Sequence, residues 1–460
     1  MFRVNSEKSR TSVKYLLSIA GLGGLLYGID FGVIAAASPY IKVLEIYSDT
    51  ELSWIVGAVL FGGIVSSLTA GMLAEKFGRK LMIIASAALF LCAIPVVCLS
   101  GGSLVTMMSG RVLQGMSAGY MSVVMPMYLT ETLPADIRGR GIGVFQFCLG
   151  FGLVLAAAVG FLVTTTFGDD AAIAWKVNFW WTMVPVAVLF LGAFRLEESP
   201  VWLEKKLRIK NEELRIAEGN SALNLQLSTS LFSRRYVIPF LLACAVLTLN
   251  KTTGMSSITS YSVMIFDKAG LGGSLANAGD CIIKLTNLVV TVFAASLMDR
   301  KGRTVMLKIG TSGMAVGMAL IGLVFLAIER FGITANSFTG ILCLAAFFMM
   351  QTFYALGPGI CVWLVLSELM PSRIRANGMA IALFLNQFVA WGLASSFLPW
   401  VNAWGWYSMF FFFAANGVLY FLVSCLIPET KGKTLDELET LFDRKIKQSN
   451  NSNNQTIFPS

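Results

Sequence analysis

The sequence predicts an all-α membrane protein with twelve transmembrane helices in two pseudo-symmetric six-helix bundles. Hydrophobic residues make up 56% of the 460 residues and charged residues only 13%, which is more apolar surface than a soluble chain of this length can bury. Apolar runs of about 20 residues match the thickness of a bilayer. Because these runs are continuous rather than alternating, they indicate helices and not a β-barrel. They cover 15–37, 51–73, 82–100, 105–127, 141–163, 178–196, 236–266, 277–298, 305–327, 341–366, 377–399 and 405–427.

An internal repeat indicates the two-bundle organisation. Each half of the chain carries a glutamate, a proline, an arginine and a glycine at the same spacing after a hydrophobic run. These residues are Glu131, Pro134, Arg138 and Gly141 in the first half, and Glu368, Pro371, Arg375 and Gly378 in the second. Charged loops and a closing glutamate also recur in the same order. They contain Glu75, Arg79 and Glu198 in the first half, and Asp299, Arg300, Arg303 and Glu429 in the second.

The distribution of positive charge predicts the orientation in the membrane. Most of the 35 Lys and Arg residues fall in the N-terminus, the C-terminal tail and alternate loops. Since positively charged loops stay in the cytoplasm, we expect both termini to be cytoplasmic. The expected parts are a cytoplasmic N-terminus (1–14), an N-terminal bundle (15–196), a cytoplasmic linker with short helices (197–235), a C-terminal bundle (236–427) and a cytoplasmic tail (428–460).

Several classes of function are disfavoured by composition. The chain has no histidine, which excludes histidine-based catalysis and a histidine proton relay. Its eight cysteines have no metal-ligand spacing, so we expect neither a metal nor a cofactor. The net charge of +9 is spread over short loops and does not indicate nucleic-acid binding. No set of nucleophile and base is present, and we expect no enzymatic activity.

Two charged residues stand out in the first half. Asp30 is the acidic residue deep in the predicted spans of that half, and Arg111 is the basic one. A carboxylate at this depth is energetically costly and by default functional, and the arginine is its natural partner. Proton binding by Asp30 is the favoured interpretation, and a buried structural ion pair is the alternative.

Polar residues gather in the middle of several spans of the second half. The seventh span contains Asn250, Lys251 and Ser256, while Asp280 and Lys284 are spaced to pair along one helix face in the eighth. Gly357-Pro358-Gly359 is expected to bend or unwind the tenth span. Such a cluster at the midplane predicts a solvated binding site.

The chain resembles the sugar porter family of the major facilitator superfamily. The resemblance rests on Gly78-Arg79-Lys80, Gly110-Arg111, Pro126-x-Tyr128-x-x-Glu131, Arg138-Gly139, Glu198-Ser199-Pro200-x-Trp202-Leu203, Asp299-Arg300-x-Gly302-Arg303, Ser367-Glu368 and Pro428-Glu429-Thr430-Lys431-Gly432. It covers essentially the whole membrane domain. It implies the major facilitator fold and alternating access around one central site.

The resemblance also assigns roles to single residues. It implies that Asp30 and Arg111 form a proton-coupling pair. Residues at sugar-contact positions are Gln146, Asn250, Lys251, Ser256, Asn287, Trp363 and Asn386, and we include Gln387. For Gln146, a hydrogen bond between helices is the alternative. The expected cytoplasmic gate consists of Glu75, Arg79, Glu131, Arg138, Glu198, Asp299, Arg300, Arg303, Glu368, Arg375 and Glu429.

Some residues depart from the pattern of the family. The family usually has two glutamines where this chain has Asn250 and Lys251, an asparagine at Ser256 and a tryptophan at Gln387. A lysine at mid-membrane needs compensation. We consider a carboxylate on the solute, Asp30 across the site, or a neutral lysine.

We therefore predict a secondary active transporter of a sugar or a sugar-like polyhydroxylated solute, coupled to protons. The alternatives are a symporter of a sugar acid or related organic anion, an uncoupled facilitator, and a non-transporting solute receptor. The expected partners are a sugar, polyol or sugar acid, the proton and the lipid bilayer. We expect a monomeric, multi-pass protein of the plasma or inner membrane.

Overall fold

The computed structural model describes residues 12–134, 137–217, 234–369 and 375–427. All regular elements in these ranges are α-helices. The first half contains α1 (Val13–Val43), α2 (Asp49–Phe77), α3 (Arg79–Cys98), α4 (Leu104–Thr132), α5 (Arg138–Phe167), α6 (Ala171–Trp180) and α7 (Met183–Ala193). A separate helix α8 (Pro200–Ala217) follows. The second half contains α9 (Arg234–Thr252), α10 (Met255–Ala269), α11 (Ser274–Lys301), α12 (Arg303–Arg330), α13 (Ser337–Leu356), α14 (Pro358–Leu369), α15 (Arg375–Trp404) and α16 (Trp406–Leu426).

The described helices are consistent with the twelve membrane-crossing segments that the sequence predicts. Ten segments of the described chain are long and apolar enough to span a bilayer, with α6–α7 and α13–α14 each counting as one. The other two are α4, which contains Arg111, and the interrupted pair α9–α10. The expected bend in the tenth segment is confirmed, since α13 ends before Gly357 and α14 begins at Pro358. The predicted start of the sixth segment at residue 178 is too late, because Asp170 caps a helix that begins at Ala171.

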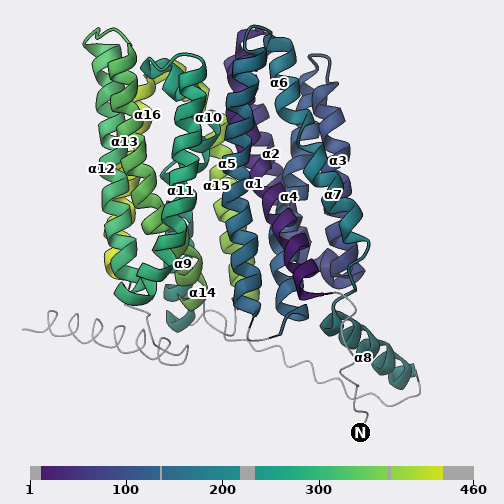
Figure 1. Ribbon diagram of the computed structural model, residues 1–460. Coiled ribbons are helices and arrows are strands. Elements are labelled where there is room, and N and C mark those ends of the chain that lie inside the picture. The colour runs from purple at the N-terminus through teal and green to yellow at the C-terminus, as the bar shows by residue number, and fades with distance from the viewer. Residues whose placement is uncertain (1–11, 135–136, 218–233, 370–374, 428–460) are drawn as a thin grey trace, which may run out of the picture.

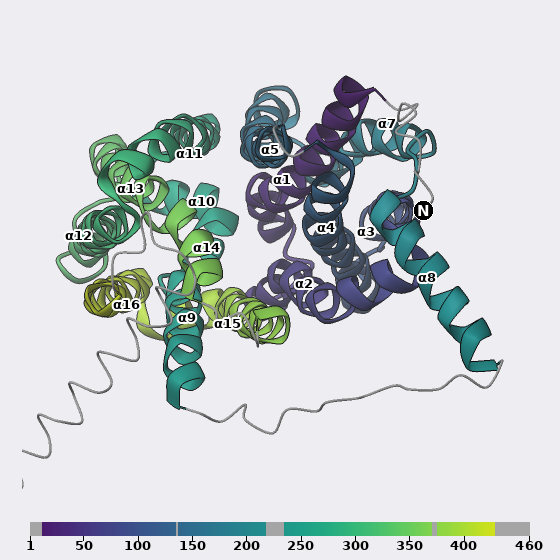
Figure 2. The same ribbon diagram turned by 90° about the horizontal axis from the view of Figure 1, so that it is seen from below.

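The segments are arranged as two bundles side by side (Figure 2). Helices α1 to α7 form the first bundle and α9 to α16 the second. The linker helix α8 lies below the first bundle, outside the spans (Figure 1). Among the described residues, the most extensive contacts between the two bundles are those of α2 with α15, α5 with α11, and α1 with α10.

Two equivalent glycine turns reflect the duplication. Gly78 separates α2 from α3, and Gly302 separates α11 from α12. Their backbone angles are nearly identical, with φ 95° and ψ 162° at Gly78, and φ 96° and ψ 158° at Gly302. Because a positive φ is strained for residues with a Cβ atom, glycine fits these sharp helix-to-helix turns in both halves.

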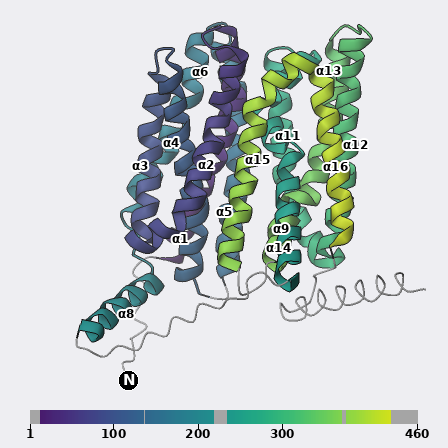
Figure 3. The same cartoon turned by 180° about the vertical axis from the view of Figure 1, so that it is seen from behind.

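The α2–α15 contact extends from one end of the molecule to its middle. The Ser53 hydroxyl accepts the amide hydrogen of Leu398 (3.1 Å), and Asn402 Nδ2 donates to Asp49 Oδ2 (2.8 Å). These residues belong to the start of α2 and the end of α15. Since the other end of α2 contacts α8, the contact lies at the end away from α8 (Figure 3).

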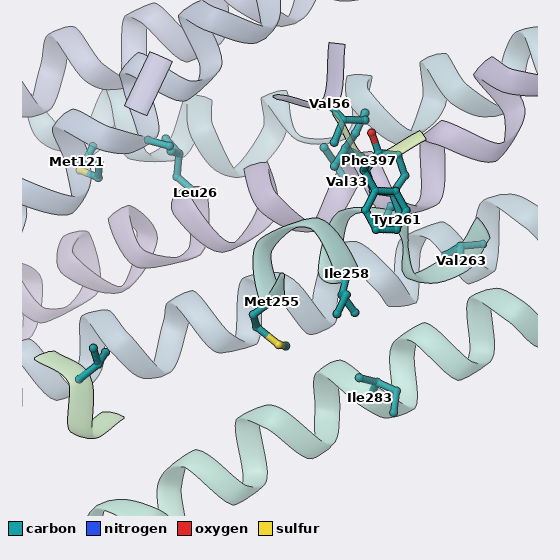
Figure 4. Packing of buried hydrophobic residues seen from close by; sticks show 14 of the residues in the cluster. Leu26, Val33, Val56, Met121, Met255, Ile258, Tyr261, Val263, Ile283 and Phe397 are labelled. Carbon is teal, nitrogen blue, oxygen red and sulfur yellow. The ribbon is translucent and has the colours of Figure 1, made fainter. Parts of the chain in front are cut away.

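Aromatic and aliphatic side chains fill this cross-bundle contact. The rings of Tyr261 in α10 and Phe397 in α15 stack with their centroids 4.5 Å apart. Val33 of α1 and Val56 of α2 lie beside them (Figure 4). The hydrophobic core is therefore continuous across the two bundles at this level.

Candidate functional site

Asp30 and Arg111 meet in the interior of the first bundle, as the sequence suggests. Arg111 Nη1 lies 3.7 Å from Asp30 Oδ1. The side chain of Arg111 is 1% exposed and that of Asp30 is 0% exposed. The Arg111 guanidinium donates to Gln114 Oε1 (2.7 Å) and lies 5.5 Å from the centroid of the Phe179 ring. The Arg111 guanidinium is thus positioned by Gln114 of α4 and Phe179 of α6, and it lies near the Asp30 carboxylate without a hydrogen bond to it.

The Asp30 carboxyl group is poorly satisfied in this arrangement. Neither of its oxygens takes part in a hydrogen bond with the described residues. A buried carboxylate without hydrogen bonds is unfavourable, and an arginine without direct hydrogen bonding offsets only part of the cost. This geometry can alternate between a charged and a protonated carboxyl group, which is the chemistry that proton coupling requires.

Sequence reasoning missed two neighbours of this pair. Gln114 follows Arg111 by three residues on α4, and Tyr27 precedes Asp30 by three on α1, so each lies on the same helix face as its neighbour. Tyr27 also lies within electrostatic range of Tyr354 in α13, which belongs to the other bundle. The spacing of three residues from Arg111 and from Asp30 was the sequence signal that could have identified Gln114 and Tyr27.

Three of the predicted solute contacts flank the break between α9 and α10, Asn250 and Lys251 at the end of α9 and Ser256 at the start of α10. The Lys251 ammonium group donates to the Ser256 hydroxyl (2.9 Å). Asn250 Nδ2 points to the carbonyl oxygen of Pro358 in α14 (3.5 Å), and Asn250 lies near Tyr354. The broken seventh segment thus brings polar groups of α9, α10, α13 and α14 together.

The remaining predicted solute contacts lie on different helices. Gln146 on α5 is exposed, and Asn287 on α11 accepts a long hydrogen bond from Thr291 (3.5 Å). Asn386 on α15 is 3% exposed, and its Oδ1 has no partner in the described part. Gln387 packs against Gly63 of α2, at the contact between the bundles. The side chain of Trp363 lies outside what the structure describes.

A second buried ion pair lies in α11. Lys284 Nζ lies 2.7 Å from Asp280 Oδ2, with 4% and 2% of the two side chains exposed. The Ser262 hydroxyl of α10 donates to the other carboxylate oxygen of Asp280 (2.6 Å). The predicted pairing along one helix face is therefore present, and it also connects α11 to α10.

Charged residues predicted to form the gate cluster at the turn between α2 and α3. The buried Arg79 side chain donates to both carboxylate oxygens of Glu131 (2.9 Å each) and to Glu75 Oε1 (3.1 Å). Glu198 Oε1 accepts the amide hydrogens of Arg79 (2.8 Å) and Lys80 (3.1 Å). All of these residues belong to the first half of the chain.

The start of the linker is attached to this cluster. The Ser199 hydroxyl donates to Glu131, and the Trp202 indole donates to the carbonyl oxygen of Glu75 (2.7 Å). Lys205 pairs with the carboxylate of Glu75 (2.7 Å). The Glu198-Ser199-Pro200-x-Trp202 motif therefore holds α8 against the first bundle.

For the other predicted gate residues, the structure gives the position in the fold of some and leaves the side chains of others undescribed. Arg138 lies at the start of α5, and Arg300 and Arg303 flank the turn between α11 and α12. The side chains of Asp299, Glu368 and Arg375, and Glu429 as a whole, lie outside the described residues. The structure therefore does not test the predicted salt bridges between the two bundles.

Two six-helix bundles around buried charges define a secondary-transporter type of membrane protein. The sequence profile of the sugar (and other) transporter family matches residues 16–442. The chain belongs to this family, the sugar porters of the major facilitator superfamily. It is therefore a transporter and not an enzyme.

Named relatives match over nearly the whole chain. It is 29% identical to the galactose-proton symporter of Escherichia coli, with 94% of this chain and 96% of the relative covered. It is 30% identical to plastidic glucose transporter 4 of Arabidopsis thaliana, with 94% and 81% covered. A solved structure of the xylose transporter of E. coli, described as inward open, matches with a TM-score of 0.77 at 24% identity, covering 94% of this chain and 100% of that one. This likeness confirms the predicted fold.

Proposed function

We propose that this protein is a symporter that moves a sugar or a sugar-like polyhydroxylated solute together with a proton. The observation that carries the proposal is the buried Asp30 carboxyl group, which has an arginine nearby but no hydrogen bond in the described part. Relatives named as galactose-proton and arabinose-proton symporters support the solute class and the coupling. The expected partners are the solute, the proton and the lipid bilayer, and we expect a monomer.

The position of the contacts between the bundles supports transport by alternating access. Two described hydrogen bonds that join them, Ser53 with Leu398 and Asp49 with Asn402, lie at the end away from α8. If α8 is cytoplasmic, as the charge distribution indicates, this arrangement is closed toward the outside. Transport requires a second state of similar free energy in which that end opens.

The charged cluster around Arg79 is proposed to act in this exchange of states. It holds the α2–α3 turn, the end of α4 and α8 as one unit. Arg138, at the start of α5, lies at the same end of the first bundle. We propose that the two halves of the repeat form salt bridges at this end when it closes. We also propose that the protein lies in the plasma membrane, with the domain limits predicted from the sequence and with both termini in the cytoplasm.

Reconstitution in proteoliposomes tests the proposal. A panel of neutral sugars, polyols and sugar acids is offered as radiolabelled solutes, with and without an inward proton gradient. We expect accumulation above the external concentration that a protonophore abolishes. Equilibration without accumulation would indicate a facilitator, and binding without uptake would indicate a receptor.

A further inference from the structure

Among the described residues, the Lys251 ammonium group has no anionic partner. Its hydrogen bond is to the Ser256 hydroxyl (2.9 Å), and no carboxylate in the described ranges lies within salt-bridge distance of it. A charged lysine at the centre of a membrane helix is energetically costly unless its charge is compensated. Another buried lysine of this protein, Lys284, is paired with the Asp280 carboxylate at 2.7 Å. The charge of Lys251 is not compensated in this way.

The surroundings of Lys251 place its ammonium group inside the second bundle. The side chain is half-buried, and its ammonium group contacts Ser256, which is itself buried. Its neighbour Asn250 is 4% exposed and points to α14 within the second bundle. The Lys251 ammonium group therefore lies among buried polar residues of the second bundle.

A second positive feature lies at the same place. Helix α10 begins in the middle of the membrane-crossing segment, after Gly254 in the left-handed conformation (φ 76°), and no side chain in the described part caps it. The first amide of α10 with an acceptor in the described part is that of Ile258, which donates to Gly254 (2.8 Å). The N-terminus of a helix carries a partial positive charge of roughly +0.5 and favours anions. The Lys251 side chain reaches forward to Ser256 in this first turn.

The same turn of α10 also contains a buried hydroxyl group without a hydrogen-bond partner in the described part. Ser257, also in the first turn of α10, is 1% exposed, and its hydroxyl group has no partner in the described part. A buried hydroxyl without a partner is unfavourable until an acceptor arrives. The ammonium group and the helix N-terminus both favour a negatively charged oxygen acceptor, and a hydroxyl group in the same turn can donate a hydrogen bond to one.

We propose that Lys251 and the first turn of α10 bind the carboxylate of the transported solute, so that the substrate is a sugar acid or a related hydroxylated monoanion. This inference rests on the proposed transport function and narrows its substrate class. One ammonium group and one helix N-terminus match a single negative charge. A phosphate ester, with up to two negative charges, would leave part of its charge uncompensated here.

The test compares sugars with their own acids. D-galactose is paired with D-galacturonate, and D-glucose with D-glucuronate, in binding measurements on the purified full-length protein. Variants Lys251→Gln and Lys251→Arg are measured beside the wild type. We expect at least one wild-type pair to favour the acid by about tenfold or more, the effect of a charge-assisted hydrogen bond. Lys251→Gln should remove this preference, while Lys251→Arg should retain it.

The outcomes separate this inference from the proposed function. Binding of the neutral sugars with no preference for their acids would overturn the anionic substrate and leave sugar transport intact. An acid preference that survives Lys251→Gln would overturn the assignment to Lys251. Binding of no member of either pair would count against both proposals. If Lys251→Gln does not fold, the wild-type ratio and its retention in Lys251→Arg decide the matter.

Discussion

Arg111 Nη1 approaches Asp30 Oδ1 to 3.7 Å without a hydrogen bond, whereas Lys284 Nζ lies 2.7 Å from Asp280 Oδ2. Both pairs are buried within spans. The second carboxylate also accepts the Ser262 hydroxyl, and the first accepts nothing in the described part. A loosely held carboxyl group can change its protonation state at small cost, and a tightly held one cannot. This difference supports the proposed coupling role of Asp30 and a structural role for Asp280.

Replacing Asp30 should separate transport from coupling. Asp30→Asn keeps the size of the side chain and mimics the protonated acid. We expect solute exchange between the two sides to persist at a rate near that of the wild type, and gradient-driven accumulation to disappear. Counterflow and uptake in proteoliposomes measure the two activities. Asp169→Asn, at an exposed loop position, is the matched control. Wild-type accumulation by Asp30→Asn would show that another group carries the proton.

Removing only one partner of the Asp280–Lys284 ion pair should destabilise the protein more than replacing both partners with uncharged residues. Asp280→Asn leaves Lys284 buried without its counter-charge, and loss of one partner of a buried pair costs about 3–5 kcal/mol. In the double variant with Lys284→Met no charge remains, so we expect a large part of the stability to return. Thermal unfolding of the purified protein measures both. A double variant that is less stable than the single one would contradict the structural role.

The spans were predictable because a bilayer demands long apolar runs, and the repeat indicated two bundles. The bend at Gly357 and the pairing of Asp280 with Lys284 follow from local spacing alone. Contacts between distant helices were not predictable in this way. Successive residues of a helix point about 100° apart, so Asn386 and Gln387 face different neighbours. Only the structure shows that Gln387 packs against Gly63.

Close packing of α2 against α4 makes Gly115 sensitive to substitution. A Cβ atom at Gly115 would overlap the carbonyl oxygen of Val59, a backbone atom that cannot move aside easily. We expect Gly115→Ala to destabilise the protein by about 1–3 kcal/mol, as overpacking does. Gly71→Ala on the same helix pair is the control, because no atom lies within 4 Å of its Cβ position. Equal melting temperatures for the two variants would contradict the close approach of α2 to α4.

Gly57 offers a direct test of alternating access. It lies on α2 where that helix meets α15, and a Cβ atom there would overlap the Ser395 hydroxyl and lie 3.3 Å from the Ser395 amide nitrogen. A leucine fits this place only if α2 and α15 move apart. Separation at the end away from α8 is the change that the proposed second state requires. Gly57→Leu should therefore favour that state rather than unfold the bundles.

Spin labels on the two bundles measure the shift. Positions 46 and 404 are exposed at the end away from α8, one before α2 and the other at the end of α15. On a cysteine-free background, we expect Gly57→Leu to lengthen the distance between the labels and to slow uptake at least tenfold. Gly139→Leu, whose Cβ position has no atom within 4 Å, should leave both unchanged. A wild-type distance distribution with normal uptake in Gly57→Leu would mean that α2 and α15 do not separate during transport, because the added side chain would then be accommodated without opening this contact.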